Sequence, residues 1–226
     1  MRDARRAVLS LILLLSGAPG AGSVGAGASA NAQQQDGADP LALVEQGESR
    51  LEAGDAAGAL AAFERAAGEI GKLLLYEKAD PDDWGDADRR IAAGLARAYL
   101  LVGETYLARN EALRALNVQP EDAGLQALLG ESYYREGRFA QADSAFSRAV
   151  RIDPALGAAH HGRGLLDLSS NRLASARERF AHAYRLDHDP RSLWSLARIA
   201  FVSRDYGEAA KRLREYLDES RGLPQE

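Results

Sequence analysis

An internal repeat of 34 residues constrains the fold of this chain more than any other feature. Its clearest trace is a column of alanines at this spacing: Ala108, Ala142, Ala176 and Ala210. Phe146 and Phe180 keep the same spacing, and so do Gly130 and Gly164. A period of this length predicts a stack of one supersecondary unit, because each copy can bury its apolar face only against its neighbours.

Within one repeat the apolar residues follow a helical period. In residues 123–156 the first stripe occupies positions i, i+3, i+4 and i+8, through Leu125, Leu128, Leu129 and Tyr133. Gly137 interrupts the pattern, and a second stripe runs from Phe139 to the residues before Pro154. Proline disfavours a helical conformation in the residue before it, so the second stripe ends there. Each unit is therefore predicted to be a hairpin of two antiparallel helices.

The registered columns divide the chain into five units with one insertion. Ala59 lies 49 residues before Ala108, which is one repeat plus 15 residues. Asp39 is expected to cap the first helix, and Pro40 fits its first turn. The predicted units are residues 40–73, 89–122, 123–156, 157–190 and 191–224, with an acidic insertion at 74–88. Repeat positions below count from the first residue of each unit.

The small, aromatic and proline columns resemble the tetratricopeptide repeat (TPR) family. That family has small residues at repeat positions 8, 20 and 27, aromatics at 11 and 24, and proline at 32. Unit 123–156 matches all six, through Gly130, Tyr133, Ala142, Phe146, Ala149 and Pro154. The second unit departs from the pattern with Ala112 at position 24, and the fourth with Asp167 at position 11. The resemblance implies an all-α fold, a right-handed solenoid of about five hairpins, and a role in binding other proteins.

The last unit differs from the others at two packing positions. Arg198 replaces a small residue and Arg214 replaces the packing aromatic. A terminal repeat has no following hairpin to cover it and needs a polar outer face. We interpret these arginines as a cap built into the final repeat.

The N-terminal residues 1–32 have the pattern of a secretory signal peptide. A basic head with Arg2, Arg5 and Arg6 precedes a short apolar run and a tail of small residues. The apolar run is shorter than the roughly 20 residues that a membrane-spanning helix needs. We predict cleavage near Ala30 or Ala32, a short linker at 33–39, and a periplasmic or secreted protein without stable membrane insertion. An uncleaved anchor or a disordered tail is the alternative.

Composition and missing motifs narrow the function further. The chain has 226 residues, 28 Lys and Arg against 33 Asp and Glu, a net charge of −5, and no cysteine. An acidic balance argues against a nucleic-acid partner, and the lack of cysteine excludes disulfides and thiolate chemistry. His160 and His161 are adjacent and would point in different directions on a helix. Because no catalytic or phosphate-binding motif is present, we expect no enzyme, no cofactor and no metal.

The insertion at 74–88 places five aspartates around Trp84. A calcium loop is disfavoured, because Trp84 and Ile91 would stand where ligands are required. The simpler interpretation is a solvated acidic turn in which Asp86 or Asp88 caps the next helix and Trp84 packs on the solenoid. A binding loop is the other interpretation, since insertions in repeat arrays usually lie on surface loops.

The resemblance also implies a concave groove, lined in the family by positions 2, 5, 9, 12 and 13 of each first helix. The candidate partner-binding residues at these positions are Arg90, Arg97, Leu101, Glu131, Tyr134, Arg135, His161, Leu165, Leu168, Ile199 and Val202. We expect the groove to bind a segment of another envelope protein, through apolar anchors and acidic groups. The alternatives are a homo-oligomeric structural component, a small-ligand or catalytic site around Tyr134 and His161, and packing of the apolar candidates between neighbouring helices.

Overall fold

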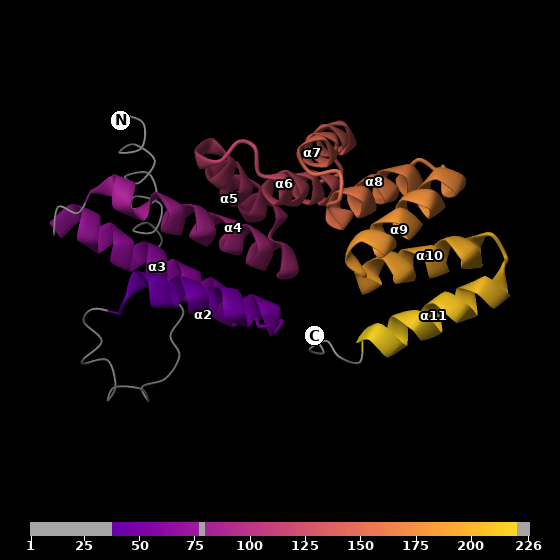
Figure 1. The fold of residues 1–226 in the computed structure, drawn as a ribbon, viewed down its shortest axis with the longest axis horizontal. Coiled ribbons are helices and arrows are strands. Elements are labelled where there is room, and N and C mark those ends of the chain that lie inside the picture. Colours follow the sequence, from indigo (N-terminus) through magenta and orange to yellow (C-terminus); the bar gives the residue numbers. More distant parts are fainter. Residues whose placement is uncertain (1–37, 77–79, 221–226) are drawn as a thin grey trace, which may run out of the picture.

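Ten α-helices and one short 3-10 helix make up the described part of the chain, which is residues 38–76 and 80–220 of a computed structural model. The helices follow one another as five hairpins: α2 (Pro40–Glu52) with α3 (Ala56–Tyr76), α4 (Gly85–Leu101) with α5 (Thr105–Val118), α6 (Ala123–Arg135) with α7 (Phe139–Ile152), α8 (Gly157–Ser169) with α9 (Leu173–Asp187), and α10 (Pro190–Val202) with α11 (Tyr206–Ser220). Figure 1 shows the hairpins stacked in chain order, with α2 and α11 towards opposite ends. No strand occurs in these residues, and the all-α solenoid is confirmed.

Aspartates cap the first helix of three hairpins. Asp39 accepts a hydrogen bond from the backbone N–H of Leu41 at 3.0 Å, so its predicted capping role is confirmed. Asp122 and Asp189 cap α6 and α10 in the same way. Each such cap stabilises a helix by about 1 kcal/mol.

The turn inside each hairpin needs one residue in the left-handed backbone region. Gly54, Gly103 and Gly137 supply it in the first three hairpins, with φ of 77°, 85° and 75°. Asn171 and Arg204 adopt the same conformation in the last two hairpins, with φ of 57° and 62°. Glycine adopts this region without steric cost, whereas an arginine there is strained.

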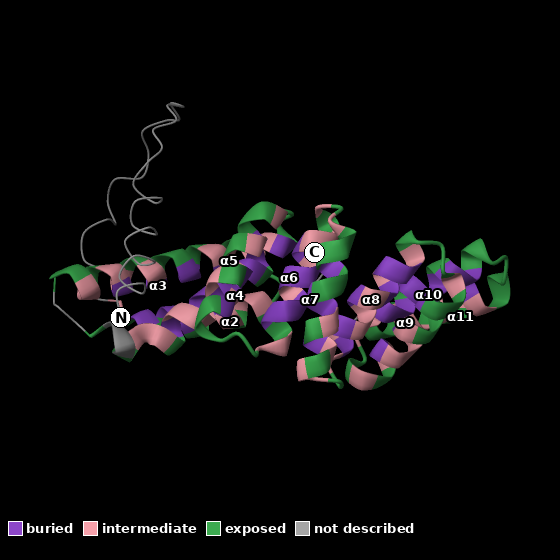
Figure 2. Cartoon of the chain, turned by 90° about the horizontal axis from the view of Figure 1, so that it is seen from above, coloured by how far each residue is buried: buried purple, intermediate pink, exposed green. Residues whose placement is uncertain are grey.

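Phenylalanine rings join successive hairpins by fitting against glycines. Phe63 is fully buried between Gly47 of its own hairpin and Gly94 of the next. A methyl group at Gly94 would lie 2.2 Å from the ring atom Cζ, which is far inside van der Waals contact. Phe146 lies in the same way between Gly130 and Gly162. The small and aromatic columns of the sequence therefore supply buried contacts that join neighbouring hairpins, and Figure 2 shows buried residues along the stack.

The departure at Asp167 is compensated by ion pairs. Asp167 is 5% exposed and accepts hydrogen bonds from Arg172 and Arg179, each at 2.6 Å. Burial acts to raise the pKa of Asp167, but the hydrogen bonds and charges of the two arginines outweigh it and hold that pKa below its usual value. A buried carboxylate with two charged partners thus replaces the aromatic residue of the family pattern.

The insertion is only partly as expected. Trp84, in the 3-10 helix η1 (Pro81–Trp84), packs against the core formed by α2, α3 and α4, as predicted. The capping role expected for Asp86 or Asp88 is wrong, because α4 begins at Gly85 and both carboxylates lie inside its first turn. There they favour the positive end of the helix dipole and pair with Arg89 and Arg114.

The predicted signal peptide, most of the 33–39 linker and residues 77–79 lie outside the described residues. Across residues 38–76 and 80–220, every helix is too short or too polar to cross a membrane.

Candidate partner-binding groove

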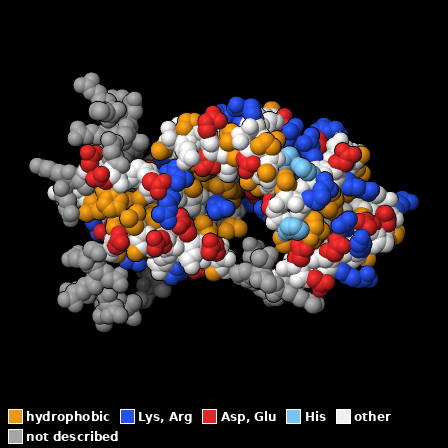
Figure 3. Space-filling model, in the orientation of Figure 1, with side chains coloured by type: hydrophobic (Ala, Val, Ile, Leu, Met, Phe, Trp, Pro, Cys, Tyr) orange, Lys and Arg blue, Asp and Glu red, His pale blue; other side chains and the backbone are white. Residues whose placement is uncertain are grey.

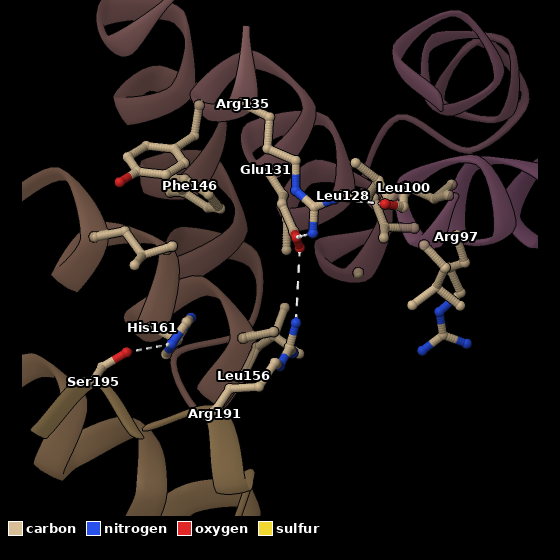
Figure 4. A pocket seen from close by; sticks show the side chains of 18 of the residues that line it. Arg97, Leu100, Leu128, Glu131, Arg135, Phe146, Leu156, His161, Arg191 and Ser195 are labelled. Carbon is tan, nitrogen blue, oxygen red and sulfur yellow. Dashed lines mark hydrogen bonds and ion pairs between the residues drawn. The ribbon is translucent and has the colours of Figure 1, made fainter. Parts of the chain in front are cut away.

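The first helices of four hairpins, α4, α6, α8 and α10, enclose a groove of about 760 Å³. Tyr216 of the second helix α11 also lines it. Figure 4 looks into this space. The groove is therefore formed mainly by the helices that the sequence register predicted.

The floor of the groove is apolar. Leu128 of α6, Leu156 before α8 and Leu165 of α8 line it together with the edge of the Phe146 ring. Trp194 of α10 is 47% exposed and stands beside Tyr216, with the two ring centroids 5.7 Å apart. This floor suits an apolar or aromatic side chain of a bound segment.

A charged network ties the walls together across three helices. Glu131 of α6 accepts a hydrogen bond from Arg135 at 2.6 Å and lies 4.0 Å from Arg191 of α10. Arg135 also donates to the carbonyl of Leu100, near the C-terminus of α4, at 2.5 Å. Arg191 pairs with the capping residue Asp189 at 2.6 Å. Arg135 and Arg191 are therefore already engaged in holding the groove together (Figure 4).

Two further arginines of the groove are exposed and free to bind. Within residues 38–76 and 80–220, Arg97 of α4 and Arg198 of α10 make no ion pair or side-chain hydrogen bond. The groove holds four arginines against two acidic residues, Asp122 and Glu131, although the whole chain has a net charge of −5. Figure 3 shows Lys and Arg side chains beside apolar surface near the middle of one face.

His161 provides a neutral polar group in the wall of the groove. Its Nε2 lies 3.4 Å from the hydroxyl of Ser195, which is 3% exposed. Burial, with the nearby charge of Arg191, lowers the pKa of His161, so the imidazole is neutral at pH 7. His161 and Ser195 occupy the same repeat position in successive units, and the stack brings them together.

The structure places the sequence-predicted residues in two groups. Those that line the groove are Arg97, Leu101, Glu131, Tyr134, Arg135, His161 and Leu165. Arg90 lies outside it and pairs with Glu48 of α2 at 2.6 Å. Leu168 packs against the core around Phe180, and Val202 is 64% exposed beyond the groove.

The assignment of Ile199 to the groove is wrong. Ile199 is 1% exposed, because α10 turns it towards Phe180 and Leu196 in the core between the last hairpins. The alternative interpretation, packing between helices, holds for this residue.

Some groove residues were missed by the register. Arg191, Trp194 and Arg198 come from turns of α10 that the family positions omit, and Tyr216 comes from a second helix. The several arginines of the last unit were the sequence feature that could have indicated Arg198 as a groove residue. Among the described side chains, no cluster of three His, Asp or Glu residues is arranged to hold a metal ion.

The stacked hairpins and their shared groove define a helical-repeat protein. The family model for the tetratricopeptide repeat matches residues 93–156 and 161–224, which is more than half of the chain. The chain belongs to the tetratricopeptide repeat family. Proteins of this family are repeat scaffolds that act in protein–protein interaction and are generally non-catalytic.

Several solved structures share the fold. The thermophilic TPR protein TTC0263 of Thermus thermophilus superposes with a TM-score of 0.65 at 21% identity, covering 81% of this chain and 92% of its own. For pilF of Pseudomonas aeruginosa the TM-score is 0.54 at 22% identity, with 83% and 78% covered. For MamA it is 0.50 at 19% identity, with 77% and 94% covered. No curated protein sequence matches the chain significantly.

Proposed function

We propose that this protein is a non-catalytic adaptor of the bacterial envelope that binds a segment of another envelope protein in its groove. The observation that carries the proposal is an apolar groove of about 760 Å³ with two exposed, unpaired arginines in the described part of an acidic chain. The TPR fold supports an interaction role, and the signal-peptide pattern of residues 1–32 supports export.

The geometry of the groove favours a particular chemistry for the bound segment. Arg97 projects from α4 and Arg198 from α10, so an acidic residue near each end of the segment can pair with them. Between these ends, an apolar side chain fits the floor at Leu128 and Leu165. Arg135 contributes less, because its guanidinium is already hydrogen-bonded to Glu131 and Leu100.

Site-specific photo-crosslinking in the native host tests the proposal. A photoreactive residue replaces Tyr134 inside the groove and, as the matched control, Arg177 on the exposed face of α9. We expect a recurrent envelope protein to crosslink at 134 and not at 177, with identification by mass spectrometry. Equal products at both positions would contradict a groove site.

Charge reversal then tests the role of the two free arginines. The double variant Arg97→Glu with Arg198→Glu is expected to lose the crosslinked product while keeping its helical circular dichroism. Arg177→Glu, an equally exposed change, is expected to keep the product. Intact mass of the native protein tests export, since cleavage after Ala30 or Ala32 defines the mature N-terminus.

A further inference from the structure

The last helix presents an uncovered face that every preceding hairpin buries. At repeat position 27, Ala115, Ala149 and Ala183 are at most 1% exposed because the next hairpin covers them. The corresponding residue of α11 is Leu217, which is 55% exposed, and Leu213 on the same face is 36% exposed. Within residues 38–76 and 80–220, the stack therefore ends on a partly apolar surface rather than on a fully polar one.

The first helix presents the complementary uncovered face. Repeat positions 3, 7 and 10 of α4 are Ile91, Leu95 and Ala98, which are buried against the preceding hairpin. The corresponding residues of α2 are exposed: Ala42, Gln46 and Ser49. Thus α2 has the face that would receive a preceding second helix, and α11 has the face that would receive a following first helix.

The repeat register pairs two particular charges across these faces. Inside the stack, the phenylalanine at position 24 fits against glycine at position 6 of the next unit, as Phe63 does with Gly94. At the two free ends, position 24 is Arg214 and position 6 is Glu45, and both side chains are exposed. Continuing the same stacking geometry from one molecule to the next would place Arg214 opposite Glu45.

The distribution of charge along the stack is uneven. Residues 38–122 contain 9 Lys and Arg against 17 Asp and Glu, whereas residues 123–220 contain 15 against 13. The acidic half begins at α2 and the basic half ends at α11, towards opposite ends of the molecule in Figure 1. The two docking helices are both net acidic, with one Lys or Arg against three Asp or Glu in α2 and three against four in α11. The register-matched pair of Arg214 and Glu45, rather than net charge, therefore favours a head-to-tail arrangement over a head-to-head one.

We propose that the occupant of the open α11 face is a second copy of this chain, docked through its α2 helix, with Arg214 paired to Glu45. The inference does not rest on the groove, to which α11 contributes only Tyr216. Such a contact joins two different surfaces and leaves a free end on each side, so it builds open chains of molecules. Its apolar part is Leu213 and Leu217, and its charged part is screened by salt.

Sedimentation velocity of the purified full-length chain over a wide concentration range, at low and high ionic strength, tests the proposal. We expect reversible association that grows with concentration and weakens with salt. Arg214→Glu and Glu45→Arg are each expected to weaken association roughly tenfold by placing like charges together. The double variant restores the opposite charges and is expected to restore association.

Two further variants separate this contact from general effects. Arg177→Glu makes the same charge change on the exposed face of α9, away from the α2 and α11 faces, and it should leave association unchanged. Leu217→Ser should weaken association without loss of helical circular dichroism. A monomer at every concentration, a double variant no better than either single variant, or an equal effect of Arg177→Glu would overturn the proposal.

Discussion

Replacing Gly94 by alanine probes the joint between the first two hairpins. The added methyl group would lie 2.2 Å from Cζ and 2.4 Å from Cε2 of Phe63. The Phe63 ring is fully buried and also contacts Gly47 on its other side, so it has no space into which to move. The substitution therefore forces α3 and α4 apart or drives the ring out of its preferred rotamer.

The expected cost follows from two opposing effects. Overpacking a close-packed core costs about 1–3 kcal/mol. Alanine regains about 1 kcal/mol relative to glycine in a helix interior. Because the ring is enclosed on both sides, we expect the overpacking to win and Gly94→Ala to lower the free energy of unfolding by about 1–2 kcal/mol. For a domain of this size, that lowers Tm by roughly 2–8 °C.

Thermal and urea denaturation followed by circular dichroism measure this effect, with Gly68→Ala as the matched control. Gly68 is also inside a helix, α3, but a methyl group there contacts nothing within 4 Å, so Gly68→Ala should stabilise the protein by about 1 kcal/mol. Adding Phe63→Leu to Gly94→Ala should cost less than the sum of the two single changes. Gly94→Ala as stable as Gly68→Ala would refute the packing argument.

Three other substitutions test separate features of the fold. Asp167→Asn should lower the free energy of unfolding by about 1–2 kcal/mol at pH 7. Because the pKa of Asp167 is depressed in the folded state, this difference from wild type should be complete above about pH 5 and should shrink as the pH falls through the folded pKa. Urea titrations at several pH values measure this trend. Arg204→Gly should raise stability by about 0.5–1 kcal/mol by relieving a positive φ of 62°, and an unchanged Tm would contradict the strain. Tyr184 donates a hydrogen bond to Glu219, which raises the pKa of Tyr184 to about 12. Glu219→Gln should therefore bring the pKa of Tyr184 back towards its usual value of about 10, as measured by ultraviolet titration. No change in the tyrosine titration would show that this hydrogen bond does not form.

The order of the helices could be predicted because the 34-residue period is carried by many columns at once. Each column corresponds to a packing contact, such as that of the Phe146 ring between Gly130 and Gly162. The repeat register therefore remains clear even where one unit departs from the pattern at a single position. The start of α4 was harder, since aspartate is favourable both before a helix and inside its first turn. The position of Asp86 in the sequence therefore could not decide at which residue α4 begins.

The groove was less predictable because it depends on how far each helix rotates about its own axis. In α10, Ile199 lies in the core whereas Trp194 and Arg198 line the groove, so this helix presents a different face to the groove from the one the register predicted. The register also cannot show which charges are already used: Arg97 and Arg135 look equivalent in the sequence, but only Arg135 is hydrogen-bonded to the facing helix. Pairing of this kind depends on side-chain geometry between units.

The groove draws its lining from residues 93 to 216, so it exists only while four consecutive hairpins are folded together. Opening any one of the joints between them removes the binding surface, and a bound segment therefore resists every such opening at once. At a partner concentration one hundred times its Kd, this linkage adds about 2.7 kcal/mol to the stability of the stack. On the proposed function, molecules without a bound segment are expected to open more often and to be degraded first, so protease resistance should rise with partner concentration.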